Sequence, residues 1–166
     1  ALKDLINAAE YLKDEKIAIV LVGHGTEKDR LIELAKQKNL KNVFFLPSVR
    51  KNMIPSILDK LDATYIGCQN KKLYKISGLS PNKILDYMMA KKCIVHSVNI
   101  NNDVVKIAKC GVSAQSEEIL EIANAIRTVA NMSKEERTML GENGYSYVLK
   151  NHDYKILADK FLKAIE

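Results

Sequence analysis

Apolar and polar positions alternate along the chain in blocks that predict strands followed by helices. The run IAIVLVG at 17–23 is apolar and β-branched almost throughout, as a strand buried on both faces requires. A glycine turn and a helical repeat follow it, and Thr26 can cap that helix. We expect further strands at 42–47, 63–68, 93–97 and 111–114, with helices at 51–60, 81–91 and 101–109. This alternation predicts an α/β fold, a Rossmann-like parallel sheet with helices on both faces.

Helical repeats occupy both ends of the chain. The spacing of apolar residues in ALKDLINAAEYLKDEK is already helical at residue 1, without a capping residue, so we interpret the chain as truncated at its N-terminus. Three helical segments form a C-terminal tail, beginning near Ser116, Ser133 and Asp153, and Ser133 with Glu136 has the spacing of a capping box. No linker-like stretch interrupts the pattern, so residues 1–166 are expected to form a single domain.

Composition favours a soluble globular protein, with 47% apolar and 28% charged residues. No apolar run reaches the length of about 18 residues that a membrane span needs, and no leader is evident, which indicates a cytoplasmic protein. Three widely spaced cysteines, Cys68, Cys93 and Cys110, indicate buried thiols rather than disulfides. The three histidines are too scattered to predict a metal site.

The net charge of +6 is concentrated in the first half of the chain. Residues 36–92 hold 12 Lys or Arg, against Asp59, Asp62 and Asp86 alone. Such an excess favours a surface that faces phosphate groups, an anionic membrane or nucleic acid, although an ordinary solvated lysine surface gives the same count. Because no exposed aromatic platform can be argued from the pattern, we expect no nucleic-acid partner.

The loops that follow the strands are where an open parallel sheet binds ligands. The loop at 67–83 is unusually long and ends in Ser80-Pro81-Asn82-Lys83. Ser80 can cap the next helix, and Pro81 suits its first position because no N–H is lost there. The free N–H groups of that first turn, with Lys83 as a countercharge, predict an anion site.

Asp86 lies one helical turn beyond this anion site. A helical wheel places it with Asn82 on the flank of an apolar face formed by Ile84, Leu85, Met88 and Met89. A carboxylate there cannot bind phosphate, but it can accept hydrogen bonds from a diol, and phosphate beside diol describes a nucleotide. Alternatively, Asp86 forms a surface ion pair with Lys83 or Lys91, and the spacing alone leaves both interpretations open.

A resemblance to a known family adds to this interpretation. The order of LVGHGTEKDRLIELAKQKN, LDATYIG, SPNKILDYMMAKKCIV and AKCGVSA resembles the C-terminal, nucleotide-sugar-binding half of family-4 (group 1) glycosyltransferases of the GT-B fold. The SPNK segment is most similar to a bacterial subgroup that builds surface polysaccharides. The resemblance implies retaining transfer from a nucleotide diphosphate-sugar, with a UDP-sugar favoured, to a glycan or polyprenyl-linked acceptor. It also implies an N-terminal acceptor domain outside this chain, without which the fragment is expected to be inactive.

The resemblance further implies roles for residues at matching positions. It assigns Asp86 to the donor ribose, Ser80, Pro81, Asn82 and Lys83 to the diphosphate, Gly23, His24 and Gly25 to a donor loop, and Val49, Arg50 and Lys51 to a loop beside the base. Many members carry two glutamates eight residues apart, whereas this chain has Gly78 and Asp86. The candidate sugar contacts are therefore Lys75, Ser77, Gly78 and Leu79. No catalytic residue is assigned.

The resemblance implies no metal ion and no cofactor, because the helix N-terminus and basic side chains would stabilise the leaving diphosphate. Part of the lysine-rich surface is expected to meet the inner membrane peripherally. Two other functions stay open. One is a nucleotide-sugar epimerase of GT-B type, which would need catalytic carboxylates and histidines in a second half. The other is a non-enzymatic α/β nucleotide-binding or receiver-like module. A receiver would need a cluster of acidic residues at the strand ends with a Lys opposite, whereas the strand ends here offer glycine, proline and amides.

Overall fold

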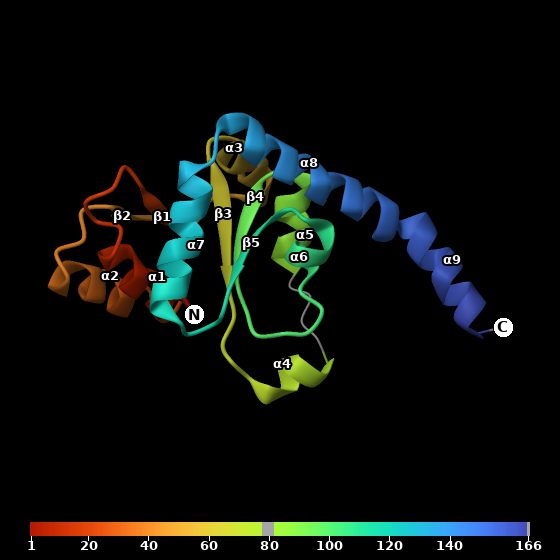
Figure 1. The fold of residues 1–166 in the computed structure, drawn as a ribbon, viewed down its shortest axis with the longest axis horizontal. Helices are drawn as coiled ribbons and strands as arrows, with labels where there is room; N and C mark the ends of the chain where they lie inside the picture. Colours follow the sequence, from red (N-terminus) through yellow and green to blue (C-terminus); the bar gives the residue numbers. More distant parts are fainter. Residues whose placement is uncertain (78–81, 166) are drawn as a thin grey trace.

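A computed structural model describes residues 1–77 and 82–165 and shows parallel strands surrounded by helices (Figure 1). The strands are short and lie within two residues of the predicted bounds. They are β1 (Ile19–Val22), β2 (Val43–Leu46), β3 (Ala63–Gly67), β4 (Cys93–Ser97) and β5 (Gly111–Ala114). The α/β class and the helices on both sides are as the sequence predicts.

Helices connect the strands and form the C-terminal tail. They are α1 (Leu2–Glu10), α2 (Lys28–Gln37), the 3-10 turn η1 (Lys51–Met53), α3 (Ile54–Asp59), α4 (Lys72–Ser77), α5 (Asn82–Met89), α6 (Val104–Ala108), α7 (Ile119–Asn131), α8 (Lys134–Asn151) and α9 (Tyr154–Ile165). The short helix α4 lies inside the segment that the sequence predicts as one long loop. No helix in residues 1–77 or 82–165 combines the length and apolar character that a membrane crossing requires.

The strands pair as two parallel sheets rather than the single sheet that the alternation predicts. One sheet has the order β1-β2 and the other β3-β4-β5. No ladder joins β1 to β3 within the described part of the chain. The two sheets are instead linked by side chains, because Leu21 of β1 and Tyr65 of β3 both pack against the same buried cluster.

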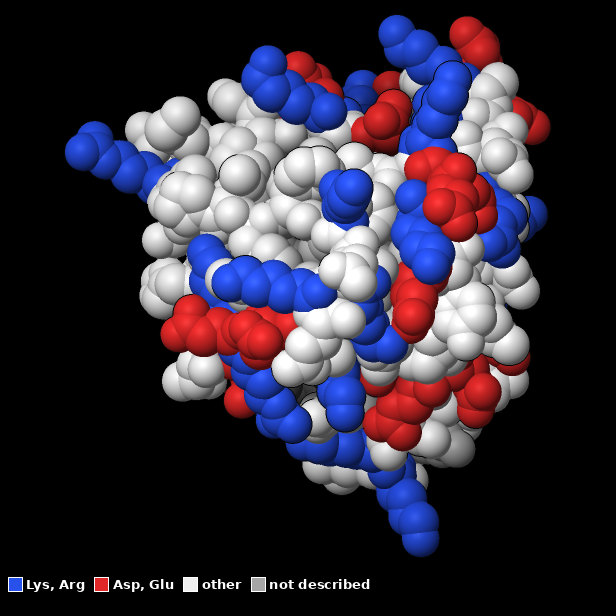
Figure 2. Space-filling model, turned by 90° about the vertical axis from the view of Figure 1, so that its left-hand side faces the viewer, with Lys and Arg blue, Asp and Glu red and all other residues white. Residues whose placement is uncertain are grey.

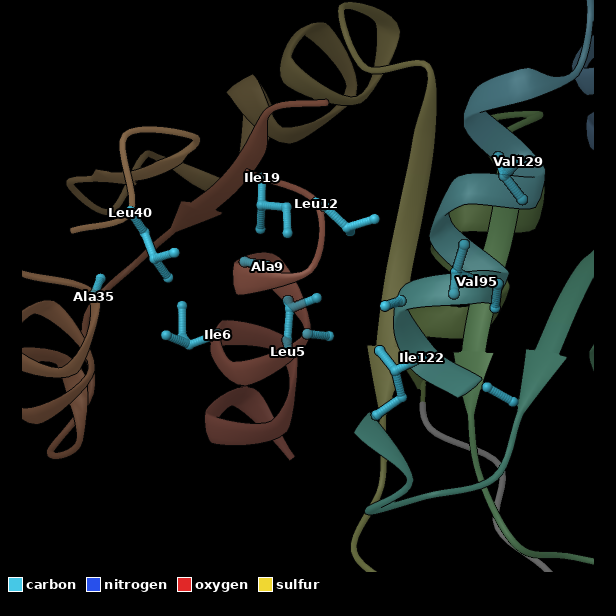
Figure 3. Close-up of a cluster of buried hydrophobic side chains, with 14 of the residues drawn as sticks. Leu5, Ile6, Ala9, Leu12, Ile19, Ala35, Leu40, Val95, Ile122 and Val129 are labelled. Carbon is cyan, nitrogen blue, oxygen red and sulfur yellow. The ribbon is translucent and has the colours of Figure 1, made fainter. Parts of the chain in front are cut away.

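Helix α1 is the centre of that first core cluster (Figure 3). Ile6 is fully buried and lies on the side of α1 toward Ala35 of α2. Leu5 lies on the side toward Ile122 of α7, which is also fully buried. Val95 of β4 belongs to the same cluster, so α1 connects the two-stranded sheet to the three-stranded one.

The second core cluster covers the other face of β4. Because successive strand residues point to opposite faces, Val95 joins the first cluster and Ile94 the second. Ile84 and Met88 of α5 are completely buried there. Helix α8 packs closely over α5, and a Cβ at Gly141 would collide with the Lys91 carbonyl, which only glycine avoids.

The predicted helix starts are partly confirmed. Ser133 and Glu136 form the expected capping box, with Glu136 N to Ser133 Oγ at 3.1 Å. Thr26 does not cap α2, which begins at Lys28. Ser116 does not cap α7 either, because Glu117 takes a left-handed conformation (φ 69°) and delays the helix to Ile119.

Candidate functional site

The predicted donor loop and base-side loop lie next to each other at the carboxyl ends of β1 and β2. Gly23 N donates to Leu46 O at 3.3 Å, and Gly23 has φ 139°, which a residue with a side chain rarely adopts. The Lys28 ammonium donates to Gly23 O at 2.7 Å and to Leu46 O at 2.8 Å. One lysine therefore holds the glycine turn against the strand that leads into the base-side loop.

Both loops expose their side chains. His24 and Gly25 lie in the exposed turn after β1. Arg50 and Lys51 are exposed, and Val49 is 37% exposed. These side chains form an open surface, as one wall of a larger site would.

The predicted ribose carboxylate, Asp86, is exposed on α5. The buried residues Ile84 and Met88 fix the rotation of this helix, and Asn82 and Lys83 share the exposed side with Asp86. None of the ion pairs between described residues includes Asp86. Lys91 is engaged elsewhere, with Glu142 at 2.9 Å and over the Tyr145 ring at 4.5 Å, so the predicted alternative of an Asp86–Lys91 pair is wrong.

Several predicted site residues lie outside the described part of the chain. Ser80 and Pro81 of the diphosphate site, and Gly78 and Leu79 of the sugar contacts, belong to this group. The side chains of Lys75 and Ser77 in α4 also lie outside the described part of the chain. Their roles stay predictions.

The described candidate residues fall into two groups. The donor and base-side loops belong to the β1-β2 sheet, while Asn82, Lys83 and Asp86 belong to α5, over the second core cluster. No hydrogen bond or ion pair among the described residues joins the two groups. Two surface hollows, of about 400 Å³ between α6 and α8 and about 490 Å³ beside α2 and β2, include none of these residues.

Hydrogen bonds between loops stiffen the carboxyl edge of the β3-β4-β5 sheet. Asn70 N after β3 donates to Glu117 Oε1 after β5 at 3.0 Å, and Ser116 N donates to Asn99 Oδ1 after β4 at 3.2 Å. Three loops are thereby tied to one another. The sequence offers no local pattern for these long-range bonds, and sequence reasoning missed them.

A buried polar network lies beneath the same edge. His96 is fully buried, Asp103 is 4% exposed, and Nδ1 of His96 lies 2.8 Å from Oδ1 of Asp103. The Asp103 carboxylate also accepts the Val105 N–H at 3.0 Å, which caps α6, and the Ser113 hydroxyl of β5. A polar residue within the apolar strand CIVHS and a capping-type residue, Asp103, before the apolar start of the next helix are the sequence signals that could have revealed this network.

The Asp103 carboxyl group is held in its ionised form. Burial alone would raise its pKa, but the hydrogen bonds from His96 and Ser113, together with that from the Val105 amide, outweigh burial and lower the pKa below the ordinary aspartate value.

Basic side chains on the side of the molecule formed by β1, β2 and α2 do not form a uniform patch. Figure 2 shows Lys and Arg spread over this face with acidic residues among them. Two of these lysines and arginines are paired, Lys38 with Glu10 at 2.6 Å and Arg30 with Glu27 at 3.4 Å. Part of the predicted basic surface is therefore an ordinary solvated surface of mixed charge.

Comparison with known proteins gives a family match over most of the chain. The family model of glycosyl transferases group 1 matches residues 1–147. The Escherichia coli (strain K12) protein named as a colanic acid biosynthesis glycosyl transferase, WcaI, is 37% identical over 57 residues. That match covers 34% of this chain and 14% of WcaI.

Solved structures with the same fold cover almost the entire chain. A mutant of S. aureus TarM, in complex with fondaparinux, α-GlcNAc-glycerol and UDP, matches 98% of this chain and 32% of TarM, with a TM-score of 0.75 and 19% identity. Anabaena HepE, in complex with UDP-glucose, matches 98% of this chain and 44% of HepE, with a TM-score of 0.75 and 16% identity. The chain thus spans less than half the length of these proteins, and the likeness establishes its fold as that of their corresponding part.

Proposed function

This chain belongs to the group 1 glycosyl transferases, and from that premise we propose that it is the donor-binding half of a retaining glycosyltransferase. Its donor is a nucleotide diphosphate-sugar, with UDP as the favoured nucleotide. Its acceptor is a glycan or a polyprenyl-linked sugar in surface polysaccharide synthesis. The family match over residues 1–147 is the observation that carries this proposal.

The relatives support the proposed donor and pathway class. TarM and HepE, which share the fold, were solved with UDP and with UDP-glucose. WcaI is named for colanic acid, a polysaccharide. We extend the donor class and the polysaccharide context from these proteins to this chain.

In the proposed site Asp86 accepts hydrogen bonds from the ribose hydroxyls. The start of α5, with Asn82 and Lys83, faces the diphosphate, and the side chains of both are exposed as this role requires. The donor loop at 23–25 and the base-side loop at 49–51 approach the nucleotide from the β1-β2 sheet. The sugar is contacted by Lys75, Ser77, Gly78 and Leu79.

The proposed reaction exchanges one glycosidic bond for another with retained configuration. The bond from the anomeric carbon to the diphosphate oxygen breaks, and a bond to the acceptor hydroxyl oxygen forms on the same face, while the hydroxyl proton passes to the leaving diphosphate. This half of the enzyme binds the nucleotide and stabilises the negative charge that develops on the diphosphate, by N–H groups and lysines without a resident metal ion.

The remaining partners of the proposal lie outside this chain. An acceptor-binding domain of the same polypeptide completes the cleft, and the chain alone transfers no sugar. The proposed enzyme works in the cytoplasm and touches the inner membrane peripherally through basic side chains, where a lipid-linked acceptor is held.

Nucleotide titration tests the donor site directly. We expect UDP to bind the chain weakly, and Asp86→Asn to weaken binding by roughly 10-fold, because hydrogen bonds to a charged group contribute about 1.5–3 kcal/mol. Calorimetry or NMR titration with UDP, GDP and ADP gives the affinities and identifies the base. Asp59→Asn, at an exposed aspartate on α3, is the matched control and should leave the affinity unchanged.

The thermal midpoint separates a binding defect from a folding defect. Asp86 is exposed, so Asp86→Asn should unfold at the same temperature as the unsubstituted chain. If none of the three nucleotides binds at millimolar concentration, the donor-site proposal is wrong.

A further inference from the structure

His96 occupies a central position beneath the carboxyl edge of the β3-β4-β5 sheet. It is the penultimate residue of β4, the middle strand, and pairs in register with Ile66 of β3 and Ser113 of β5. By strand alternation it points to the same face as Ile94, toward the second core cluster and helix α5. The imidazole therefore lies on the side of the sheet that carries Asp86.

The hydrogen bond of this imidazole links β4 to two further elements, α6 and β5, through one carboxylate. His96 Nδ1 lies 2.8 Å from Asp103 Oδ1, and Asp103 in turn accepts bonds from the start of α6 and from Ser113 of β5. The loop of residues 98–103 runs between these two bonded residues. Its position is fixed at one end by β4 and at the other by the carboxylate that His96 holds.

The loop is also bound to the rest of the carboxyl edge. Cys68 N donates to Ser97 O at 2.9 Å, Val98 N to Ala114 O at 2.9 Å, and Ser116 N to Asn99 Oδ1 at 3.2 Å. The loop after β3, which leads to α4 and to the start of α5, is thus linked to residues 97–99. The loop that ends at Asp103 is therefore hydrogen-bonded to the same edge at which the donor is proposed to bind.

Packing alone does not account for a histidine here. Its second nitrogen, Nε2, is buried and has no hydrogen-bond partner among the described residues, an arrangement that opposes folding. An apolar side chain of similar size would fill the same space without that cost. The hydrogen bond of Nδ1 to Asp103 is the gain that the imidazole provides.

We propose that His96 is a positioning residue of the donor site, which orients Asp103 and thereby orders the loop of residues 98–103. This inference rests on the proposed function, because it concerns the affinity of the same nucleotide site. His96 does not contact the nucleotide. It acts through the carboxylate that caps α6 and holds β5.

Two substitutions at His96 distinguish positioning from packing. His96→Leu replaces the imidazole with an apolar side chain of comparable size, and so removes the hydrogen bond to Asp103. His96→Asn places an amide N–H where Nδ1 lies, and so can restore that bond. Ile94→Val is the control on the same strand and face, since it perturbs the second cluster without touching the polar network.

The order of the loop is the first readout, measured on the unliganded chain by amide relaxation in NMR. We expect residues 98–103 to become mobile in His96→Leu and to stay ordered in His96→Asn and Ile94→Val. A loop that stays equally ordered in His96→Leu overturns the proposal, whatever the thermal midpoint does.

The affinity for UDP is the second readout, measured below the thermal midpoint of every variant. We expect His96→Leu to weaken binding roughly 3- to 10-fold and His96→Asn to recover most of that loss. Equal affinities in His96→Leu and the unsubstituted chain overturn the positioning role and leave the donor site standing. If the unsubstituted chain binds no nucleotide, the proposed function is wrong, and the role of His96 in donor binding is wrong with it. The NMR measurement still shows in that case whether the His96–Asp103 bond orders residues 98–103.

Discussion

The Asp103 carboxylate organises the residues around it because it is buried and accepts several hydrogen bonds. His96, Val105 and Ser113 all donate or lie within hydrogen-bond distance of its two oxygens. These bonds lower the pKa of Asp103 against the opposing effect of burial. Little of this follows from the sequence, because His96 and Ser113 meet at Asp103 only when β4 and β5 have paired, and only the cap to Val105 is local.

Stability should therefore depend on pH at the acid end. A carboxyl group whose pKa is lower in the folded state stabilises that state above its unfolded pKa of about 3.9, and the stabilisation is lost as pH falls through the folded pKa. We expect the free energy of unfolding, measured in urea, to fall below about pH 4. Asp103→Asn should lose roughly 2–4 kcal/mol at pH 7 and show a smaller acid decline.

An exposed aspartate gives the control for this dependence. Asp29 of α2 is exposed and makes no side-chain hydrogen bond among the described residues, so Asp29→Asn should lose at most about 1 kcal/mol, from the helix dipole, and leave most of the acid decline in place. Equal acid declines in Asp103→Asn and the unsubstituted chain would assign the effect to other carboxyl groups.

At the scale of elements, the sequence predicts strands and tail helices well and long loops poorly. Apolar runs such as CIVHS mark where the strands begin and end, because a strand buried on both faces needs apolar residues at nearly every position. The prediction that Ser133 caps a helix is confirmed, because its capping hydrogen bonds are local. The prediction that Ser116 caps α7 is wrong, because Glu117 takes a left-handed conformation between Ser116 and the helix. Helix α4 was missed, since the six residues KLYKIS offer only Leu73 and Ile76 at helical spacing, too short a pattern to distinguish a helix from a loop.

Helix α9 contributes no residue to either core cluster of the described chain. It continues beyond α8 away from the sheets (Figure 1), and its Tyr154 and Phe161 are 90% and 67% exposed. We expect deletion of residues 153–166 to lower the free energy of unfolding by at most about 1 kcal/mol, because little apolar area is buried there. Urea unfolding of the shortened chain measures this. A loss above about 3 kcal/mol would mean that α9 packs against the body in solution.

At the scale of the whole molecule, two core clusters lie on opposite faces of β4. The sequence predicts the layered class, but not that the strands divide into two sheets or that α1 joins them, because side-chain packing between distant segments decides both. The first cluster contains the buried thiol of Cys93, and the second contains those of Cys68 and Cys110. Burial raises the pKa of Cys93 to about 11 and that of Cys110 to about 12.

These thiols report whether the two clusters open together. In the folded chain we expect both to react slowly with iodoacetamide, because the thiolate is scarce and inaccessible. Ile6→Val, in the first cluster, should accelerate labelling of Cys93 roughly 2- to 10-fold and leave Cys110 unchanged, since such a substitution costs about 0.5–1.5 kcal/mol. Mass spectrometry of the labelled peptides measures both rates. Equal acceleration of both cysteines would show that the clusters open as one unit.

The division into two sheets has a consequence for the behaviour of the chain in concentrated solution. Within the described residues, β1 and β3 each leave one edge without a ladder partner, and an unpaired strand edge is a template for pairing with another chain. Such an edge accepts any extended segment, whatever its sequence, including a strand from another copy. At millimolar concentration the solubility of this chain therefore depends on how strongly copies associate, as well as on how stably each copy folds. Lysines near these strands, such as Lys28, oppose association because like charges on two copies repel each other.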